Sequence, residues 1–197
     1  MSAAWDAYAA AFDDEPDHGL RDPAVRAAWS ALLASVLPPE PSSVVDLGCG
    51  TGSLALLAAE QGHRVCGLDE SAQMLRLARA KAPALPLVRG DATRPPFARG
   101  SFDVVLVRHV LWSVPDPSAT LARWLGLADR LVLVEGRWST GAGLTAAACV
   151  ELLRRLGREA EPIRLTDPAL WGGPVADERY LVTTAAGQGS RSGGRSW

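Results

Sequence analysis

A glycine-rich segment constrains the fold of this chain more than any other feature. It reads VVDLGCGTGSLA over residues 44–55, so an apolar run leads through Gly48, Gly50 and Gly52 directly into a helical pattern. Glycines at such a junction allow a tight turn and close approach of a ligand, and the helix start adds free N–H groups. An isolated loop of this kind could equally be an ordinary tight turn. The segment predicts a buried strand followed by a helix, with a candidate ligand-binding loop between them.

Apolar runs and helical patterns alternate along the rest of the chain. The predicted strands cover residues 44–47, 65–68, 87–89, 104–107 and 131–134, with two further candidates at 163–165 and 180–184. The predicted helices cover residues 5–12, a segment capped by Asp22, 53–61, 70–81, a segment capped by Ser118, and 145–156. Because these strands are continuous apolar runs, they favour a parallel sheet with helices on both faces. The expected fold class is a doubly wound α/β domain.

The length of 197 residues suits one domain with a single core. We expect a helical lid segment at residues 1–40, the main domain at 41–184 and a disordered tail at 185–197. The tail prediction rests on the sequence GQGSRSGGRSW, which has almost nothing apolar to bury.

Charge and hydropathy argue against several classes of protein. The net charge is −2 and no run of Lys or Arg occurs, which argues against a nucleic-acid partner. The longest apolar runs, at residues 54–59 and 144–150, are far too short to cross a membrane. Early acidic residues argue against a secretory signal, and three scattered cysteines are typical of a reducing compartment without a metal site. We expect a cytoplasmic monomer or homodimer.

Three acidic side chains accompany the ends of the first three predicted strands. Asp46 precedes the first glycine by two residues, Asp69 ends the second strand, and Asp91 follows the third. The carboxyl ends of parallel strands meet at one edge of a sheet, where an acid can accept hydrogen bonds from ribose hydroxyls. Each acid alone could be a helix cap or a solvated turn residue. Together they predict a nucleoside-binding site.

These motifs resemble those of a known enzyme family. VDLGCGTG, the strand-end acid and GDATRPPFARGSFDVVLVRHVLW are similar to the class I S-adenosylmethionine-dependent methyltransferases, over about residues 40–135. The resemblance implies a seven-stranded sheet whose last strand, at residues 180–184, is antiparallel. It implies S-adenosyl-L-methionine as the cofactor. The family often places a Pro-Gly-Gly turn before the fifth strand, whereas this chain has WLGLADR.

The resemblance also implies how the methionine end of the cofactor is held. Asp46 and the backbone of Gly48 and Gly50 would bind it, and Arg108 lies where the family contacts the amino-acid end. Tyr8 could close over the site from the N-terminal helix, or it could simply pack there.

At the nucleoside end, Asp69 would take the ribose hydroxyls. Asp91 would accept from the adenine amino group, and the Ala92 N–H would contact the ring. Met74 would cover the adenine face, or it could be ordinary helix core. The candidate cofactor residues are Tyr8, Asp46, Gly48, Cys49, Gly50, Asp69, Glu70, Met74, Asp91, Ala92 and Arg108.

Candidate catalytic residues are His109, His18 and Glu135. An imidazole can accept a proton near neutral pH, although both histidines could merely hydrogen-bond locally. Glu135 could orient a substrate amine or the base, or it could pair with Arg137 or accept a loop N–H. His63 is predicted to lie at the surface, at the opposite edge of the sheet. Trp112 and Trp138, which follow the fourth and fifth strands, could be pocket walls or core.

The methyl acceptor is less constrained than the cofactor. Methyltransferases that act on base amino groups commonly carry an Asn/Asp-Pro-Pro-aromatic motif after the fourth strand, where this chain has RHVLW. A small molecule with an oxygen or nitrogen nucleophile is the remaining prediction. Two alternatives stay open: a protein that binds the cofactor without turnover, and a nicotinamide-dependent oxidoreductase, whose loop is usually GxGxxG.

Overall fold

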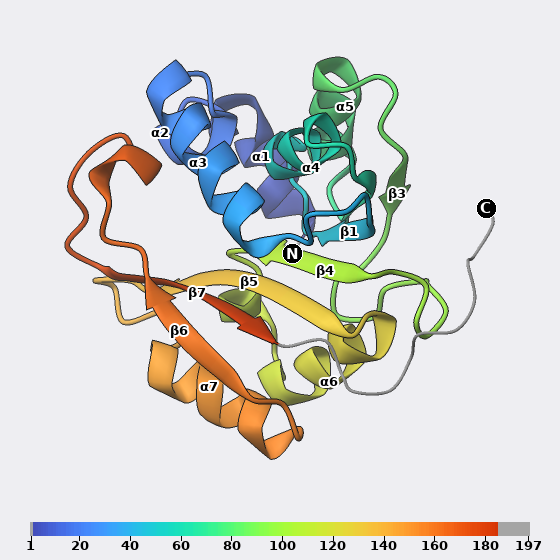
Figure 1. Cartoon of the computed structure of the whole chain (residues 1–197). Coiled ribbons are helices and arrows are strands. Elements are labelled where there is room, and N and C mark those ends of the chain that lie inside the picture. The colour runs from blue at the N-terminus through green and yellow to red at the C-terminus, as the bar shows by residue number, and fades with distance from the viewer. Residues whose placement is uncertain (1, 185–197) are drawn as a thin grey trace.

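Seven strands form one sheet in a computed structural model that describes residues 2–184 (Figure 1). The strand order is β3-β2-β1-β4-β5-β7-β6. Strands β1 to β5 are mutually parallel, and β7 runs antiparallel to both of its neighbours, β5 and β6. The strands are β1 (Ser43–Leu47), β2 (Arg64–Asp69), β3 (Leu87–Arg89), β4 (Val104–Arg108), β5 (Arg130–Arg137), β6 (Ala160–Arg164) and β7 (Glu178–Thr184). The predicted fold class, including the antiparallel last strand, is confirmed.

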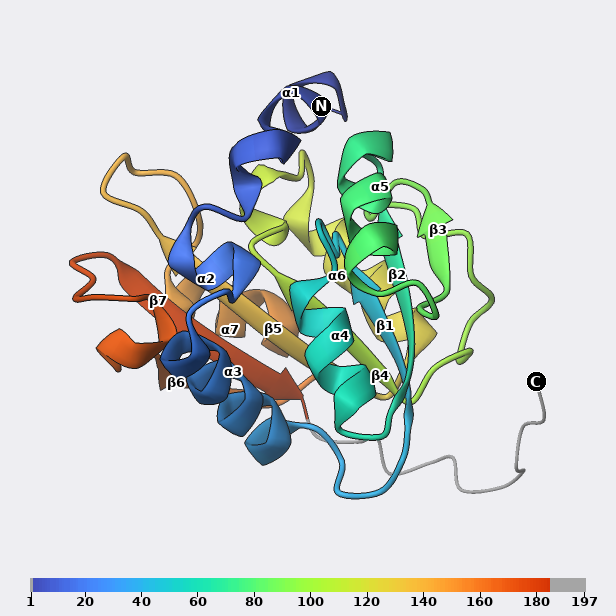
Figure 2. The same cartoon turned by 90° about the horizontal axis from the view of Figure 1, so that it is seen from above.

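Helices cover both faces of this sheet (Figures 1 and 2). One apolar core packs α3 and α4 against the sheet around Trp29, and the other packs α6 and α7 around Trp124. The α-helices are α1 (Ser2–Phe12), α2 (Pro16–Gly19), α3 (Pro23–Val36), α4 (Ser53–Glu60), α5 (Ala72–Lys81), α6 (Pro117–Leu127) and α7 (Ala146–Arg155). Two short 3-10 helices, η1 (Leu111–Ser113) and η2 (Pro168–Leu170), complete the described elements.

Local capping chemistry decides where two of the helices begin. Asp116 caps α6 by accepting the Ala119 N–H at 2.9 Å, and Pro117 occupies the first helical position. The predicted cap at Ser118 is therefore wrong, because an Asp-Pro pair begins the helix earlier. Helix α5 begins after the cap Ser71 and not at Glu70, because β2 extends through Asp69.

Two predictions at the periphery also differ from the structure. Strand β6 begins three residues before the predicted position, because this edge strand pairs only with β7 and is mostly exposed. His63, predicted at the surface, is buried, and its Nδ1 accepts the Ser42 N–H at 3.2 Å. The predicted disordered tail lies outside the described residues.

The N-terminal segment crosses above the carboxyl edge of the parallel strands, where α1 packs beside α5 (Figure 2). Asp6 accepts the Ser71 hydroxyl at 2.5 Å and the Gln73 N–H at 3.1 Å. Asp13 pairs with Lys81 at 2.9 Å. These contacts hold α1 over the ends of β1 and β2. Within residues 2–184, no helix is both long and apolar enough to cross a membrane.

Candidate functional site

The loop between β1 and α4 has a backbone shape that only glycines adopt without strain. Gly48, Gly50 and Gly52 have φ angles of 73°, 54° and 79°. A Cβ on Gly48 would lie 2.3 Å from the Val110 side chain. The Gly50 N–H donates to the Asp69 carboxylate at 2.9 Å. The loop therefore lies close against the ends of β2 and β4, and Gly48 and Gly50 line a cavity.

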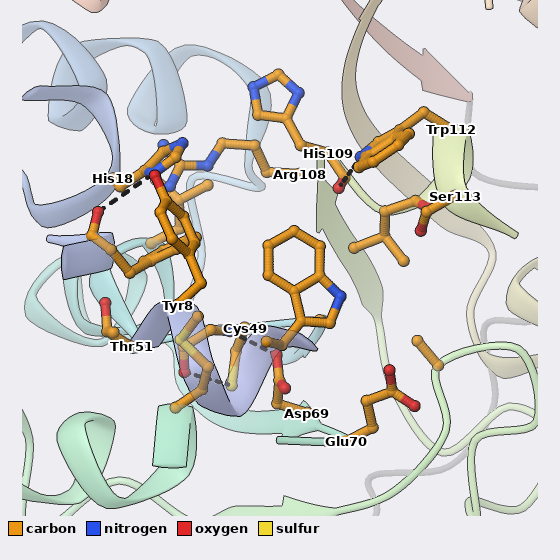
Figure 3. A pocket seen from close by; sticks show the side chains of 18 of the residues that line it. Tyr8, His18, Cys49, Thr51, Asp69, Glu70, Arg108, His109, Trp112 and Ser113 are labelled. Carbon is orange, nitrogen blue, oxygen red and sulfur yellow. Dashed lines mark hydrogen bonds between the residues drawn. The ribbon is translucent and has the colours of Figure 1, made fainter. Parts of the chain in front are cut away.

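A cavity of about 530 Å³ lies above this loop, at the carboxyl edge of the sheet. Its walls come from α1, the α2 segment, the ends of β1, β2 and β4, and the loops that follow β3 and β5. Figure 3 shows Asp69 and Glu70 on one side of the pocket and His109 and Trp112 on the other. All the residues predicted to bind cofactor line it: Tyr8, Asp46, Gly48, Cys49, Gly50, Asp69, Glu70, Met74, Asp91, Ala92 and Arg108.

The two strand-end carboxylates are poorly solvated. Burial raises the pKa of Asp46 to about 7, against the opposing influence of Arg108. Burial also raises the pKa of Asp69, although the N–H groups of Ser71 and Gly50 donate to its two oxygens. Carboxylates in such surroundings gain strongly from a cationic or hydroxyl-bearing ligand. Asp91 differs, because it is exposed and binds Thr93 through both its oxygens.

Arg108 connects the N-terminal segment to the end of β4. Its guanidinium donates to the Asp17 carbonyl and lies 5.0 Å from the centre of a Trp29 ring. Burial lowers its pKa, while Asp17 and Asp46 act in the opposite direction. An arginine stays charged in proteins, so it supplies a fixed cation beside Asp46.

His109 begins the turn after β4 with a φ angle of 55°, an uncommon conformation for a non-glycine residue. Both of its ring nitrogens are buried and have no hydrogen-bond partner among the described residues. Burial is the main cause that lowers its pKa well below the usual value, and Arg108 and Arg179 add to it. The imidazole is therefore neutral at pH 7 and has one nitrogen able to accept a proton.

His18 also lines the cavity but is tied to its own segment. Its ring stacks on Phe12 at 4.3 Å between centroids, and its Nδ1 lies 3.2 Å from the Phe12 carbonyl oxygen. Because a carbonyl only accepts, Nδ1 carries the proton in this bond. Burial lowers the pKa of His18, and Asp17 opposes that shift.

Glu135 does not line the cavity. It is buried and accepts the Leu111 N–H at 2.6 Å, so it holds the short helix η1 in place. Burial raises its pKa to about 8. Glu135 thus lies behind the cavity wall that carries His109 and Trp112. Of the roles considered from the sequence, the contact it makes is the acceptance of a loop N–H.

The sequence patterns did not indicate several of the residues that line the cavity. Trp5 and Phe12 extend the aromatic face of α1, and Arg179 enters from the first residues of β7. Arg179 could have been found from its position, because the start of an antiparallel strand lies at the same edge as the ends of its parallel neighbours. Trp112 and Trp138, whose roles were open, both line the cavity. Within residues 2–184, no group of three or more His, Cys, Asp or Glu is arranged to hold a metal ion.

Part of the chain matches a known family. Residues 45–129 fit the family model described as a methyltransferase domain. This segment therefore carries a methyltransferase domain. The matched residues include the glycine loop, the ends of β2 and β3, and His109.

Curated relatives carry the same domain. The chain is 34% identical over 159 residues to a trans-aconitate 2-methyltransferase from Methylobacterium radiotolerans, covering 69% of this chain and 59% of the relative. It is 33% identical over 111 residues to a demethylmenaquinone methyltransferase from Renibacterium salmoninarum, covering 54% of this chain and 47% of the relative. The chain spans about half the length of the curated relatives it matches.

Solved structures share the fold. A chain of the complex between the Haloferax volcanii Trm112 methyltransferase activator and its partner, a protein assigned as a methyltransferase, superposes with a TM-score of 0.71 at 25% identity. The match covers 92% of this chain and 97% of that one. Magnesium protoporphyrin IX methyltransferase from Synechocystis PCC 6803, crystallised with bound S-adenosylmethionine, superposes with a TM-score of 0.64 at 24% identity and covers 81% and 77% of the two chains.

Proposed function

We propose that this protein uses S-adenosyl-L-methionine to methylate an oxygen or nitrogen atom of a small molecule. The observation that carries the proposal is the convergence of Asp46, Asp69 and Asp91 with the glycine loop on one cavity. This arrangement offers carboxylates for a ribose and an ammonium group, and close-approach backbone for the chain between them.

The cavity fits the methionine end of the cofactor near β1. Asp46 would pair with the ammonium group, and Arg108 would contact the carboxylate of the amino-acid end. The glycine loop supports this fit, because Gly48 and Gly50 line the cavity and carry no side chain. Tyr8 would close the site from α1, where we place a lid formed by residues 1–40.

The nucleoside would lie across the ends of β2 and β3. Asp69 would accept from the ribose hydroxyls, with Glu70 beside it, and Asp91 and the Ala92 N–H would contact adenine. Met74 is almost fully buried, yet it lines the cavity, and this suits contact with one face of a flat ring.

The cofactor supplies a methyl group that its positive sulfur already activates, so the protein mainly aligns the acceptor and excludes water. Alignment of this kind contributes roughly 7–11 kcal/mol to barrier reduction. His109 would take the proton of a hydroxyl nucleophile, or the extra proton of a neutral amine that has attacked, as the new bond to the methyl carbon forms and the carbon–sulfur bond breaks. The products are then the methylated acceptor, S-adenosylhomocysteine and a protonated imidazole.

Two observations support a small acceptor. The curated relatives are named for trans-aconitate and demethylmenaquinone, both small molecules. In addition, the net charge of −2 is unfavourable for a polyanionic nucleic acid.

Calorimetric titration tests the cofactor assignment. We expect the protein to bind S-adenosylmethionine and not NAD, and Asp69→Ala to weaken cofactor binding at least tenfold, because two hydroxyls lose their acceptor. Glu60→Ala is the matched control, because it removes an exposed carboxylate of α4 outside the cavity and should leave affinity unchanged. Thermal melting of each variant verifies folding. Unchanged affinity in a folded Asp69→Ala variant would show that the ribose assignment is wrong.

A further inference from the structure

One wall of the cavity lies apart from the carboxylates assigned to the cofactor. It consists of His109 and Trp112 after β4, Trp138 after β5, and Arg179 on β7, and it is called here the β4–β7 wall. The sheet order puts β4, β5 and β7 on the side of β1 opposite to β2 and β3. The wall therefore faces the part of the cavity that remains for the methyl acceptor.

Arg179 is fixed in this wall by its neighbours. Its guanidinium carbon lies 5.2 Å from the centres of both the Trp138 and Trp171 rings. It pairs with Asp177 at 3.2 Å, and the other oxygen of Asp177 accepts the Ser139 N–H at 2.7 Å. Opposite Arg179 in the β5–β7 register stands Gly136, where a Cβ would lie 3.1 Å from the Arg179 side chain. The Arg179 side chain therefore has little conformational freedom to lose when a ligand binds.

Arg179 also has unused hydrogen-bonding capacity. A guanidinium has five N–H donors, and Arg179 donates to Asp177, while its buried Nε has no partner among the described residues. The other permanent cation among the described cavity-lining residues is Arg108, which already donates to the Asp17 carbonyl and lies over Trp29. A planar guanidinium with free N–H groups can bind a carboxylate through two parallel hydrogen bonds.

The rest of the β4–β7 wall is aromatic and held rigidly. The Trp138 ring lies 5.5 Å from the Trp112 ring and 5.4 Å from the His109 ring, between centroids. Trp112 donates from its indole nitrogen to the His109 carbonyl at 2.8 Å. Gly143 supports Trp138 from behind, because a Cβ there would lie 2.5 Å from the indole ring. Such a surface favours contact with a flat, apolar molecule.

The two ring nitrogens of His109, which have no hydrogen-bond partner among the described residues, also indicate a ligand at this wall. Buried polar atoms without partners are rare in folded proteins, and they occur where a ligand or water provides the missing bond. His109 lines the cavity beside Trp138, so a group bound on the aromatic surface can supply that bond.

We propose that the methyl acceptor is a flat, apolar molecule with a carboxylate group, which binds with its ring on Trp112 and Trp138 and its carboxylate on Arg179. The inference rests on the proposed methyltransferase function and names the substrate class for it. The carboxylate is an anchor and not the methylated group, because pairing with a guanidinium reduces its nucleophilicity. The nucleophile is a separate hydroxyl or amine that faces His109.

Paired probes test the anchor without knowledge of the true acceptor. The full chain, saturated with S-adenosylhomocysteine, is titrated with 1-naphthoate and with 1-naphthamide, which has the same shape and no charge. We expect the naphthoate to bind at least tenfold more tightly. Arg179→Gln should abolish this preference, and Arg179→Lys should retain part of it. Arg164→Gln is the matched control, because it removes an exposed arginine of the neighbouring strand β6 and should leave the preference unchanged.

The affinity for S-adenosylhomocysteine, measured first for each variant, verifies that the site is intact. Equal affinity for the two probes, an equal loss for both in Arg179→Gln, or binding of neither would overturn the proposal. A wild-type protein that fails to bind S-adenosylhomocysteine contradicts the methyltransferase function instead, so the two failures are distinguishable.

Discussion

His109 keeps its place through contacts of its backbone, and this leaves its side chain free for a ligand. The His109 N–H donates to the Val134 carbonyl at 2.9 Å, and its own carbonyl accepts from Trp112. Glu135 holds the next turn by accepting the Leu111 N–H. The ring itself makes no hydrogen bond within the described residues, so its nitrogens remain available to hydrogen-bond with the molecule that is methylated.

This arrangement predicts a specific kinetic defect. With an acceptor found by screening hydroxylated and aminated aromatic acids, His109→Ala should lower kcat by about 10²- to 10⁴-fold, the range for a lost general base. The affinity for cofactor should change far less. The pKa of His109 is lowered, so the wild-type rate should stay high down to pH values below 6.5 and fall only as the imidazole is protonated. That acid limb should be absent in the variant.

The matched control is His63→Gln, since His63 lies at the opposite edge of the sheet and only accepts the Ser42 N–H. Its kcat and pH profile should equal those of the wild type. A His109→Ala variant with normal turnover would remove this residue from the mechanism.

Side-chain direction explains which site residues sequence could predict. Asp46 and Asp69 are fixed by their place at strand ends, so the motif was enough to place both in the cavity. Glu135 has an equally suggestive position, yet its side chain turns toward the Leu111 N–H. Arg179 gave no motif at all, because its role depends on its contacts with Trp171 and with Trp138, which comes from a loop far away in sequence.

At the scale of elements, helix α1 depends on a polar network under its C-terminal end. Lys81 of α5 pairs with Asp13 at 2.9 Å and donates to the hydroxyls of Thr51 and Ser53 at 2.9 and 2.8 Å. The side chains of Lys81 and Asp13 are 23% and 14% exposed, so solvent screens the pair only in part. The network connects the N-terminal segment to the glycine loop and to α5.

Loss of this network should loosen α1 without unfolding the domain. Lys81→Met retains the aliphatic stem and removes the charged donor, and hydrogen bonds to charged groups contribute about 1.5–3 kcal/mol. We expect amide exchange in residues 3–13 to become at least tenfold faster, measured by hydrogen–deuterium exchange mass spectrometry. Arg76→Met, on the exposed face of the same helix, should change nothing. If exchange in α1 stayed at the wild-type rate in Lys81→Met, the network would have no part in holding the helix.

Among the elements, buried strands were easier to predict than edges and caps. Strands β1 and β4 are buried along almost their whole length, and sequence predicted each to within one residue. Strand β6 consists mostly of exposed residues, so the hydropathy pattern did not predict its first three residues. The start of α6 depended on the choice between two neighbouring caps, and Asp116 takes the cap position because Pro117 follows it.

At the scale of the molecule, the order of strands in the sheet brings the site residues together. Because β2, β1 and β4 are adjacent and parallel, Asp69, Asp46 and Arg108 come to one edge from distant parts of the chain. Strand spacing alone could not give that order, whereas the family resemblance implied the seven-stranded sheet. The same order sets the β4–β7 wall apart from the proposed cofactor site within one cavity.

The decisive measurement is a crystal structure of the protein with S-adenosylhomocysteine. We expect the ribose hydroxyls to lie within hydrogen-bond distance of Asp69 and the amino group to lie at Asp46. The homocysteine sulfur should face the β4–β7 wall. A ligand bound elsewhere, or one whose ribose makes no contact with Asp69, would show that the proposed cofactor site is wrong.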